Sequence, residues 1–177
     1  MALRANGTAG NYLRYDTSPP NWGDITFTGF AKLTVDRNAF STLFLLGYPT
    51  DTWDNEHFFI GTDSDGTTLQ CWENSMGGIT MMNALTVGRT YGIAIRNSGT
   101  ALVFHVLDTV SGAVSTYSTT LPSGYVGTSM EGFRLFDGPY SEPLNGTIFG
   151  VKLFSADIGE ARALNELRAV RPVNPTN

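Results

Sequence analysis

The sequence has little that could supply disulfides, thiolate metal sites or a surface for nucleic acid. Its single cysteine, Cys71, excludes an intramolecular disulfide and cannot by itself build a thiolate zinc site. Eleven Lys and Arg residues stand against sixteen Asp and Glu residues, a formal net charge of −5. Because a phosphate-backbone partner requires clustered cations, this balance predicts no binding to nucleic acid.

Long apolar runs are also lacking. Positions 1–20 contain no run of seven or more apolar residues, which is the core of a secretory signal, and no later stretch approaches the eighteen that cross a bilayer. We therefore expect no membrane insertion and no signal peptide in the chain as written. A signal peptide removed before this chain begins is the alternative interpretation.

Charged residues are scarce, whereas residues typical of strands and turns are abundant. Charged residues make up 15% of the 177 residues, below the usual quarter, and the chain holds 20 Gly, 22 Thr and 12 Ser. A chain of this length builds one core. We therefore expect a single domain over residues 1–170 and an extended tail over 171–177, where Pro172 and Pro175 interrupt any regular element.

Apolar and polar side chains alternate most clearly over Ile25–Val35, with Phe30 as the exception. This period of two is typical of a strand with one buried face. Similar short stretches are Tyr12–Tyr15, Thr42–Tyr48, His57–Gly61, Thr67–Glu73, Thr90–Arg96, Ala101–Thr109, Ala113–Thr119, Gly132–Phe136 and Gly146–Phe154. Turn residues such as Asp63-Ser64-Asp65-Gly66 separate them and indicate antiparallel hairpins. The pattern predicts an all-β sandwich or barrel.

One short helix is predicted near the C-terminus. Asp157 and Glu160 have the spacing of a capping box, and Pro172 ends the segment. The apolar residues that share one helical face are Ile158, Ala161, Leu164 and Leu167.

Four segments occur in an order that is more informative than composition. They are Gly10-Asn11-Tyr12-Leu13, Ile25-Thr26-Phe27-Thr28-Gly29-Phe30-Ala31-Lys32, Tyr91-Gly92-Ile93-Ala94-Ile95 and Leu144-Asn145-Gly146-Thr147-Ile148-Phe149-Gly150-Val151-Lys152-Leu153-Phe154. In this order the chain resembles the laminin-G-like, concanavalin-A-like lectin and glucanase superfamily. The resemblance implies a two-sheet antiparallel jelly-roll sandwich with one short C-terminal helix, used in that family for recognition of glycans or proteins.

The chain departs from the family pattern at three positions. Phe30 and Tyr91 stand where the family usually has Trp, which preserves a large aromatic side chain for the core. Phe149 stands where the family usually has Asp, which removes a carboxylate and weakens any metal site carried over from the resemblance.

Catalysis is not expected from the acidic residues or the histidines. Retaining glycosidases of this fold place carboxylates about 5 Å apart on one strand face, in a Glu-x-Asp pattern. No Asp follows two residues after Glu56, Glu73, Glu131, Glu142, Glu160 or Glu166. His57 and His105 are the only histidines, and His105 lies within an apolar strand, where packing explains it. We therefore predict a protein that is not an enzyme.

Acidic loops offer hard oxygen ligands for Ca²⁺ at Asp51, Asp54, Asp63 and Asp65. Turn-forming Asp residues explain the same clusters without a metal, and Asp63-x-Asp65-Gly66 lacks the rest of a calcium-loop motif. The expectation is therefore no required cofactor, with Ca²⁺ as the alternative.

Aromatic side chains in expected loops are the candidate ligand-binding residues. Trp53 stands beside Asp54 and Asn55, and Tyr140 lies in a loop rich in proline and acidic residues. An aromatic face next to amide and carboxylate groups suits a sugar ring or a protein hot spot. The alternative for Trp53 is that it covers the end of a sheet.

Two classes of function follow from these observations. The first is a non-catalytic interaction or attachment protein, such as a capsid-decoration or tail-associated component of a phage particle, located on the virion surface or outside the cell after release. Lys32 and Lys152 are the only lysines, so edge strands have little lysine to resist pairing and neighbouring subunits could cover them. The second is a lectin-like carbohydrate-binding module of a bacterial protein. A glycoside hydrolase is a distant alternative.

Overall fold

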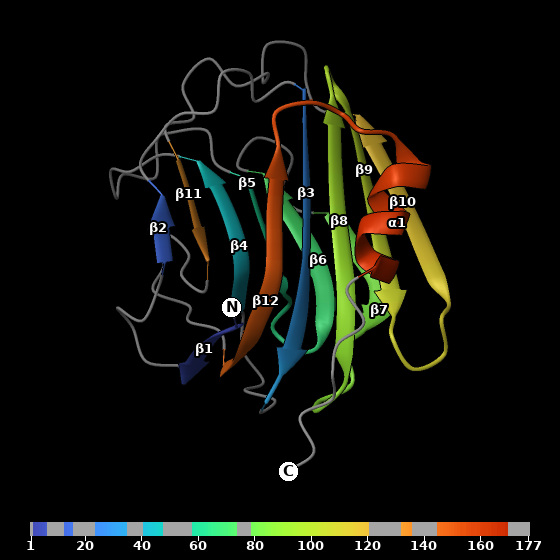
Figure 1. Cartoon of the computed structure of the whole chain (residues 1–177). Helices are drawn as coiled ribbons and strands as arrows, with labels where there is room; N and C mark the ends of the chain where they lie inside the picture. Colours follow the sequence, from blue (N-terminus) through green and yellow to red (C-terminus); the bar gives the residue numbers. More distant parts are fainter. Residues whose placement is uncertain are drawn as a thin grey trace.

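The computed structural model describes residues 2–6, 13–15, 24–34, 41–47, 58–73, 79–120, 132–135 and 145–169. These residues form two antiparallel sheets of six strands each and one helix, as Figure 1 shows. The first sheet, in spatial order, consists of β1 (Ala2–Asn6), β12 (Asn145–Phe154), β3 (Asp24–Leu33), β8 (Thr90–Ser98), β9 (Ala101–Asp108) and β10 (Val114–Thr120). The second consists of β2 (Leu13–Tyr15), β11 (Gly132–Leu135), β4 (Ser41–Gly47), β5 (Phe58–Thr62), β6 (Thr68–Glu73) and β7 (Ile79–Ala84). The helix α1 spans Glu160–Ala169.

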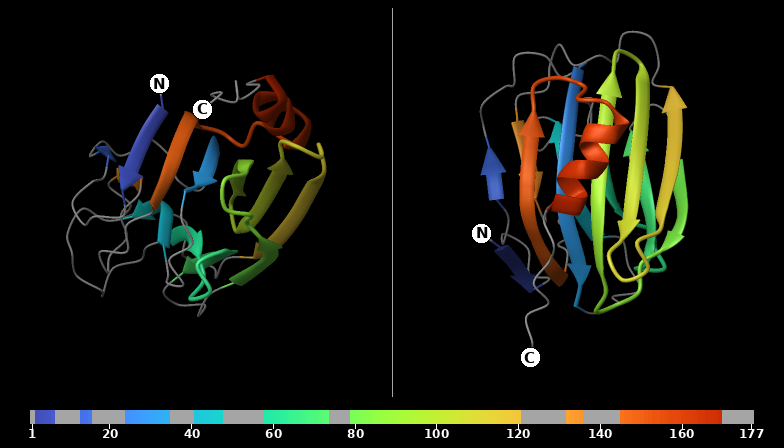
Figure 2. Two further views of the ribbon diagram at one scale, coloured as in Figure 1. Left: turned by 90° about the horizontal axis from the view of Figure 1, so that it is seen from below. Right: turned by 45° about the vertical axis from the view of Figure 1, so that its right-hand side comes forward.

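The two sheets lie face to face and enclose the main core (Figure 2). Alternate residues of the central strands supply its buried side chains, as the period-two pattern predicts. They include Ile25, Phe27, Ala31, Leu33, Leu43, Ile60, Leu69, Leu85, Tyr91, Ile93, Ile95, Leu102, Phe104, Val106 and Ile148. The prediction of an all-β, two-sheet antiparallel sandwich with a short C-terminal helix is therefore confirmed.

The helix α1 covers the outer face of the first sheet over β3 and β8. Phe30, Ala94 and Leu107 from the sheet meet Ala163 and Leu167 from the helix in a second buried cluster. This cluster explains why Phe30 breaks the alternation of its strand: the helix covers this part of the outer face, so the outward position of Phe30 is buried and carries an apolar side chain. The predicted helix is present, although the regular helix begins at Glu160. Its predicted apolar face was wrong at Ala161, which is exposed, because Ala163 packs on the sheet instead.

The residues that depart from the family pattern fill space in the sandwich. The rings of Phe30 and Phe149 stack at 5.3 Å between centroids, on the helix-covered side. Tyr91 is buried in the main core, and its hydroxyl accepts a 3.0 Å hydrogen bond from the Thr86 N–H. Replacement of the family's Trp by Phe30 and Tyr91 thus keeps aromatic side chains inside, as expected.

Two edge strands were missing from the sequence prediction. β1 pairs with β12 and β7 pairs with β6, although neither segment shows apolar alternation. The expected tail over residues 171–177 lies outside the described residues, so the domain boundaries remain a prediction. Within the ranges described, no helix is long and apolar enough to cross a membrane.

Candidate functional site

Most of the predicted contact residues lie outside the described part of the chain. This holds for the ligand-binding candidates Trp53, Asp54, Asn55 and Tyr140 and for the metal candidate Asp51. Their roles remain predictions.

The other two metal candidates, Asp63 and Asp65, lie in the turn that joins β5 to β6. Asp65 Oδ1 accepts the N–H groups of Thr67 at 2.8 Å and of Thr68 at 2.7 Å, and its other oxygen bonds the Thr68 hydroxyl. Asp63 Oδ1 accepts the Ser64 N–H at 2.6 Å. Gly66 has a φ of 77°, which glycine adopts without strain, and its N–H donates to the Asp63 carbonyl at 2.7 Å.

These bonds give the two carboxylates a structural role in the turn. The hydrogen bonds from Thr68 are the main reason that the pKa of Asp65 lies below its ordinary value. Within the described residues, no three His, Cys, Asp or Glu side chains come together as a metal-binding group. The arrangement therefore matches the turn-forming interpretation, and a calcium role for Asp63 and Asp65 remains untested.

Acidic groups near the helix also hold the fold together. Arg96 on β8 donates from Nε to Asp157 Oδ1 at 2.7 Å and from its terminal nitrogen to Oδ2 at 2.8 Å. These charge-assisted bonds hold the pKa of Asp157 below its usual range. Asp24 Oδ1 accepts the Asp157 N–H at 2.8 Å, and Lys152 pairs with Glu166 at 2.6 Å.

His105 is completely buried on the helix-covered side of the first sheet. Its Nδ1 lies 3.0 Å from the Thr116 hydroxyl on β10, whereas its Nε2 has no hydrogen-bond partner. Burial disfavours the charged imidazolium and lowers the pKa of His105 below 6.5. Arg96 acts in the same direction, and Glu160 and Asp157 oppose it. Burial therefore favours the neutral ring, which packs inside the fold as the sequence predicts for a histidine in an apolar strand.

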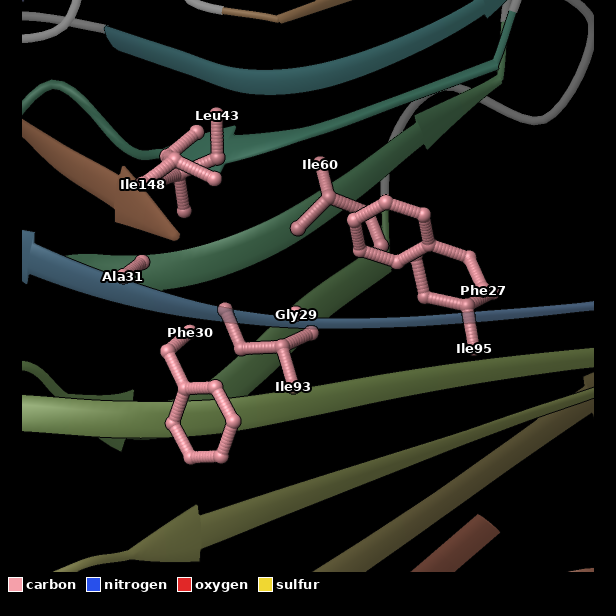
Figure 3. Close-up of a pocket in the computed structure, with 9 residues that line it drawn as sticks. All are labelled: Phe27, Gly29, Phe30, Ala31, Leu43, Ile60, Ile93, Ile95 and Ile148. Atoms are coloured by element: carbon pink, nitrogen blue, oxygen red, sulfur yellow. The ribbon is translucent and has the colours of Figure 1, made fainter. Parts of the chain in front are cut away.

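An apolar cavity of about 20 Å³ lies between the sheets (Figure 3). Leu43 and Ile60 line it from the second sheet, facing Phe27, Ile93 and Ile148 of the first. All of its lining residues are apolar or glycine, so a water molecule would find no polar side-chain partner there. A volume of this order holds no sugar ring, and the cavity is a packing feature rather than a ligand site.

Sequence reasoning missed a polar row on the outer face of the second sheet. Thr42 on β4 stands opposite Gly61 on β5, which stands opposite Gln70 on β6, so all three share one face. The sequence neighbour of each of these residues points into the core, and these neighbours are Leu43, Ile60 and Leu69. Among the described residues, Thr42 Oγ1 and Gln70 Nε2 are buried without a hydrogen-bond partner. No sequence signal marks this row, because it depends on the register of three strands.

No protein-family model matches the sequence, and no curated protein matches it. The similarity to known proteins is in structure. The heptameric SAP-like pentraxin of Limulus polyphemus superposes with a TM-score of 0.69 at 16% identity, over 97% of this chain and 84% of the pentraxin. The Trypanosoma rangeli sialidase gives a TM-score of 0.71 at 10% identity, over 95% of this chain and 29% of the sialidase.

A third similar structure is the enzymatically active domain of tailspike protein 2 from bacteriophage CBA120. It gives a TM-score of 0.60 at 15% identity, over 92% of this chain and 26% of the tailspike chain. This chain thus spans less than a third of the sialidase and tailspike chains. At these identities the likeness concerns the fold alone, and it confirms the concanavalin-A-like sandwich that the resemblance predicted. Proteins named as enzymes and proteins not so named share this fold.

Proposed function

We propose that the protein is a non-catalytic interaction and attachment protein, a structural component of a phage particle that uses its lectin-like sandwich for protein or glycan contacts. The observation that carries this proposal is that five acidic side chains in the described part of the chain are engaged in contacts within the fold. Asp24, Asp63, Asp65 and Asp157 accept hydrogen bonds that fasten turns and the start of the helix, and Glu166 pairs with Lys152. A glycosidase would need two carboxylates turned toward a shared substrate.

The phage assignment draws support from one further feature. A phage tailspike domain shares the sandwich over nearly this whole chain. Trp53, Asp54, Asn55 and Tyr140 are the residues that we assign to ligand contact, with Trp53 and Tyr140 as the aromatic anchors.

A docking experiment tests the attachment role. The purified protein is incubated with phage capsids and tails from which it is absent, and binding is measured by co-sedimentation. Saturable docking that weakens in Trp53→Ala or Tyr140→Ala supports the proposal. The control is Val110→Ala, a change at a 69% exposed side chain in the β9–β10 turn. Absence of docking to every particle part contradicts the virion role.

The second candidate is a carbohydrate-binding module. It is favoured because a sialidase shares the fold and because Asp54 and Asn55 follow Trp53 directly in the sequence. A glycan array with and without calcium separates the two roles: a sugar signal lost in Trp53→Ala, without particle docking, favours the lectin. Reducing-end release from a β-glucan or sialoside panel would instead establish the hydrolase and overturn the non-catalytic proposal.

A further inference from the structure

The strand β10 forms one edge of the first sheet, and its sequence is unprotected against pairing. Its seven residues, Val-Ser-Thr-Tyr-Ser-Thr-Thr, include no charged residue, no proline and no glycine. In the part of the chain that the structure describes, β9 is its only strand partner. Edge strands of soluble proteins normally carry charge, proline or a bulge, because a bare edge recruits another strand.

The absence of charge is confined to one side of the sandwich. Figures 1 and 2 place β10 and β7, the edge of the second sheet, on the same side. The six residues of β7 also carry no charge. The edges of the opposite side, β1 and β2, carry Arg4 and Arg14. The β7–β10 side therefore presents two strand edges without a charged side chain to an approaching chain.

The register of β9 and β10 shows which backbone groups point outward. The Asp108 N–H donates to the Ala113 carbonyl at 2.9 Å, which makes this a hydrogen-bonded pair. Because such pairs alternate along an antiparallel ladder, Ser115, Tyr117 and Thr119 direct their backbone groups toward β9. The backbone groups of the intervening residues point away from the sheet, and these residues are Val114, Thr116, Ser118 and Thr120.

We propose that β10 pairs antiparallel with β10 of a second copy of this chain, about a twofold axis at Tyr117. In this register Val114 stands opposite Thr120 and Thr116 stands opposite Ser118, so each outward-pointing residue meets another. Every such pair exchanges two backbone hydrogen bonds. The first sheets of the two copies join into one continuous sheet.

A second copy fits this edge better than a charged partner does. Each chain carries a net charge of −5, so two copies associate most easily through a surface without charge. The seven-residue strand is centred on Tyr117, which packs on the main core and would stand opposite its symmetry mate at a close, non-hydrogen-bonded position. Thr116, Ser118 and Thr120 are exposed, so no rearrangement is needed to reach the edge.

Charge-swap variants at Ser118 test the pairing. In the proposed dimer the two Ser118 side chains are diagonal neighbours, about 7–8 Å apart. Ser118→Lys alone and Ser118→Glu alone should each weaken self-association by about tenfold or more through like-charge repulsion. An equimolar mixture of the two variants should restore association as a heterodimer. Val110→Lys, in the exposed β9–β10 turn, adds the same charge outside the ladder and should leave association unchanged.

The measurements are sedimentation velocity from micromolar to millimolar concentration and native mass spectrometry of the mixture. Circular dichroism confirms that the variants remain folded. A wild-type protein that stays monomeric over this range overturns the proposal. So does a dimer that both Ser118 variants leave intact, because its interface would then lie elsewhere.

A cysteine at the twofold axis tests the register. Tyr117→Cys should form a disulfide-linked dimer under mild oxidation, because non-hydrogen-bonded pairs have Cα separations of about 4.5 Å, within disulfide range. If loss of the aromatic ring unfolds this variant, a mixture of Ser115→Cys and Thr119→Cys provides the same test at a neighbouring pair. The wild type with Cys71 alone is the control. Failure of both to cross-link contradicts the register. None of these results depends on docking to particles or glycans, so this proposal and the proposed function can fail separately.

Discussion

Thr42 places a buried hydroxyl without a hydrogen-bond partner in the second sheet. Burying a hydroxyl without a partner costs about 1–3 kcal/mol in proteins. Thr42→Val keeps the β-branched shape, and Val is at least as favourable as Thr in a strand. We therefore expect the free energy of unfolding to rise by about 1 kcal/mol, measured by urea denaturation. A loss of more than about 1 kcal/mol would indicate that the hydroxyl bonds a group bound to this face.

Asp65 shows whether the acidic turn serves the fold or a metal. Asp65→Ala removes the acceptor for two backbone N–H groups in an exposed turn, so we expect a loss of about 1 kcal/mol. The melting temperature should fall equally in EDTA and in excess Ca²⁺. Asp63→Ala, which removes one such acceptor, should cost less. A wild-type protein that Ca²⁺ stabilises strongly, with the effect lost in Asp65→Ala, would instead assign this turn to a metal.

His105 makes the stability depend on pH in a defined window. Its pKa in the folded state lies below 6.5 because burial disfavours the imidazolium, so the unfolded chain binds the proton more readily. The contribution of the neutral, buried His105 to the free energy of unfolding is fully present above pH 6.5. It is lost as the pH falls from 6.5 through the folded-state pKa. His105 faces Thr116 on β10 and Arg96 on β8, with Asp157 and Glu160 at the start of α1.

The measurement is the free energy of unfolding of the wild type and of His105→Leu at about pH 7.5, 6.5 and 5.5. We expect the wild type to lose stability toward the acid end and the variant to lose less, because its buried side chain cannot be protonated. His57, the only other histidine, is present in both proteins and cancels in the comparison. Parallel pH profiles for the two proteins would contradict this assignment.

At the level of elements, ion pairs tie the helix segment to the sheet, and the less exposed of those described joins Arg96 to Asp157. Arg96 and Asp157 have side chains only 16% and 17% exposed, and Asp157 Oδ1 also accepts the Gly159 N–H at 2.9 Å. Arg96→Ala leaves this carboxylate partly buried without its cation, at a cost of about 2 kcal/mol by urea denaturation. Lys152→Ala breaks the more exposed pair with Glu166 and should cost less than about 1 kcal/mol. Equal costs would mean that α1 does not depend on the Arg96 bridge.

Strands whose alternate residues enter the core were predictable from the sequence, and features that depend on neighbouring elements were not. The alternation over Ile25–Val35 predicted a strand, and alternate residues of β3 do enter the core. Phe30 breaks the pattern because a helix that is distant in sequence covers it. β1 and β7 carry no alternation, since an edge strand gains its structure from the ladder beside it.

The candidate site was less predictable than the fold for a related reason. Asp63-Ser64-Asp65-Gly66 was predicted as a turn because its chemistry is local, and the structure confirms it. The row of Thr42, Gly61 and Gln70 arises from the register of three strands, which no single segment encodes. Trp53 and Tyr140 were proposed from side-chain chemistry alone, and they lie outside the described residues.

The whole molecule joins segments from opposite ends of the chain, and this predicts slow folding. Ala2 pairs with Phe149 in the first sheet, and Leu13 pairs with Leu135 in the second, so both sheets close only after most of the chain has been ordered. Loop-closure entropy opposes such contacts until native packing stabilises them. We therefore expect a main refolding phase in the range of milliseconds to seconds, measured by stopped-flow tryptophan fluorescence. Slower phases from the 8 prolines should follow it.

The order of strand formation can be measured separately. The two successive hairpins formed by β8, β9 and β10 should acquire amide protection in pulsed hydrogen exchange before β1 and β12 do. Protection of β1 in step with these hairpins, or refolding within microseconds, would contradict the order in which long-range pairing follows local pairing.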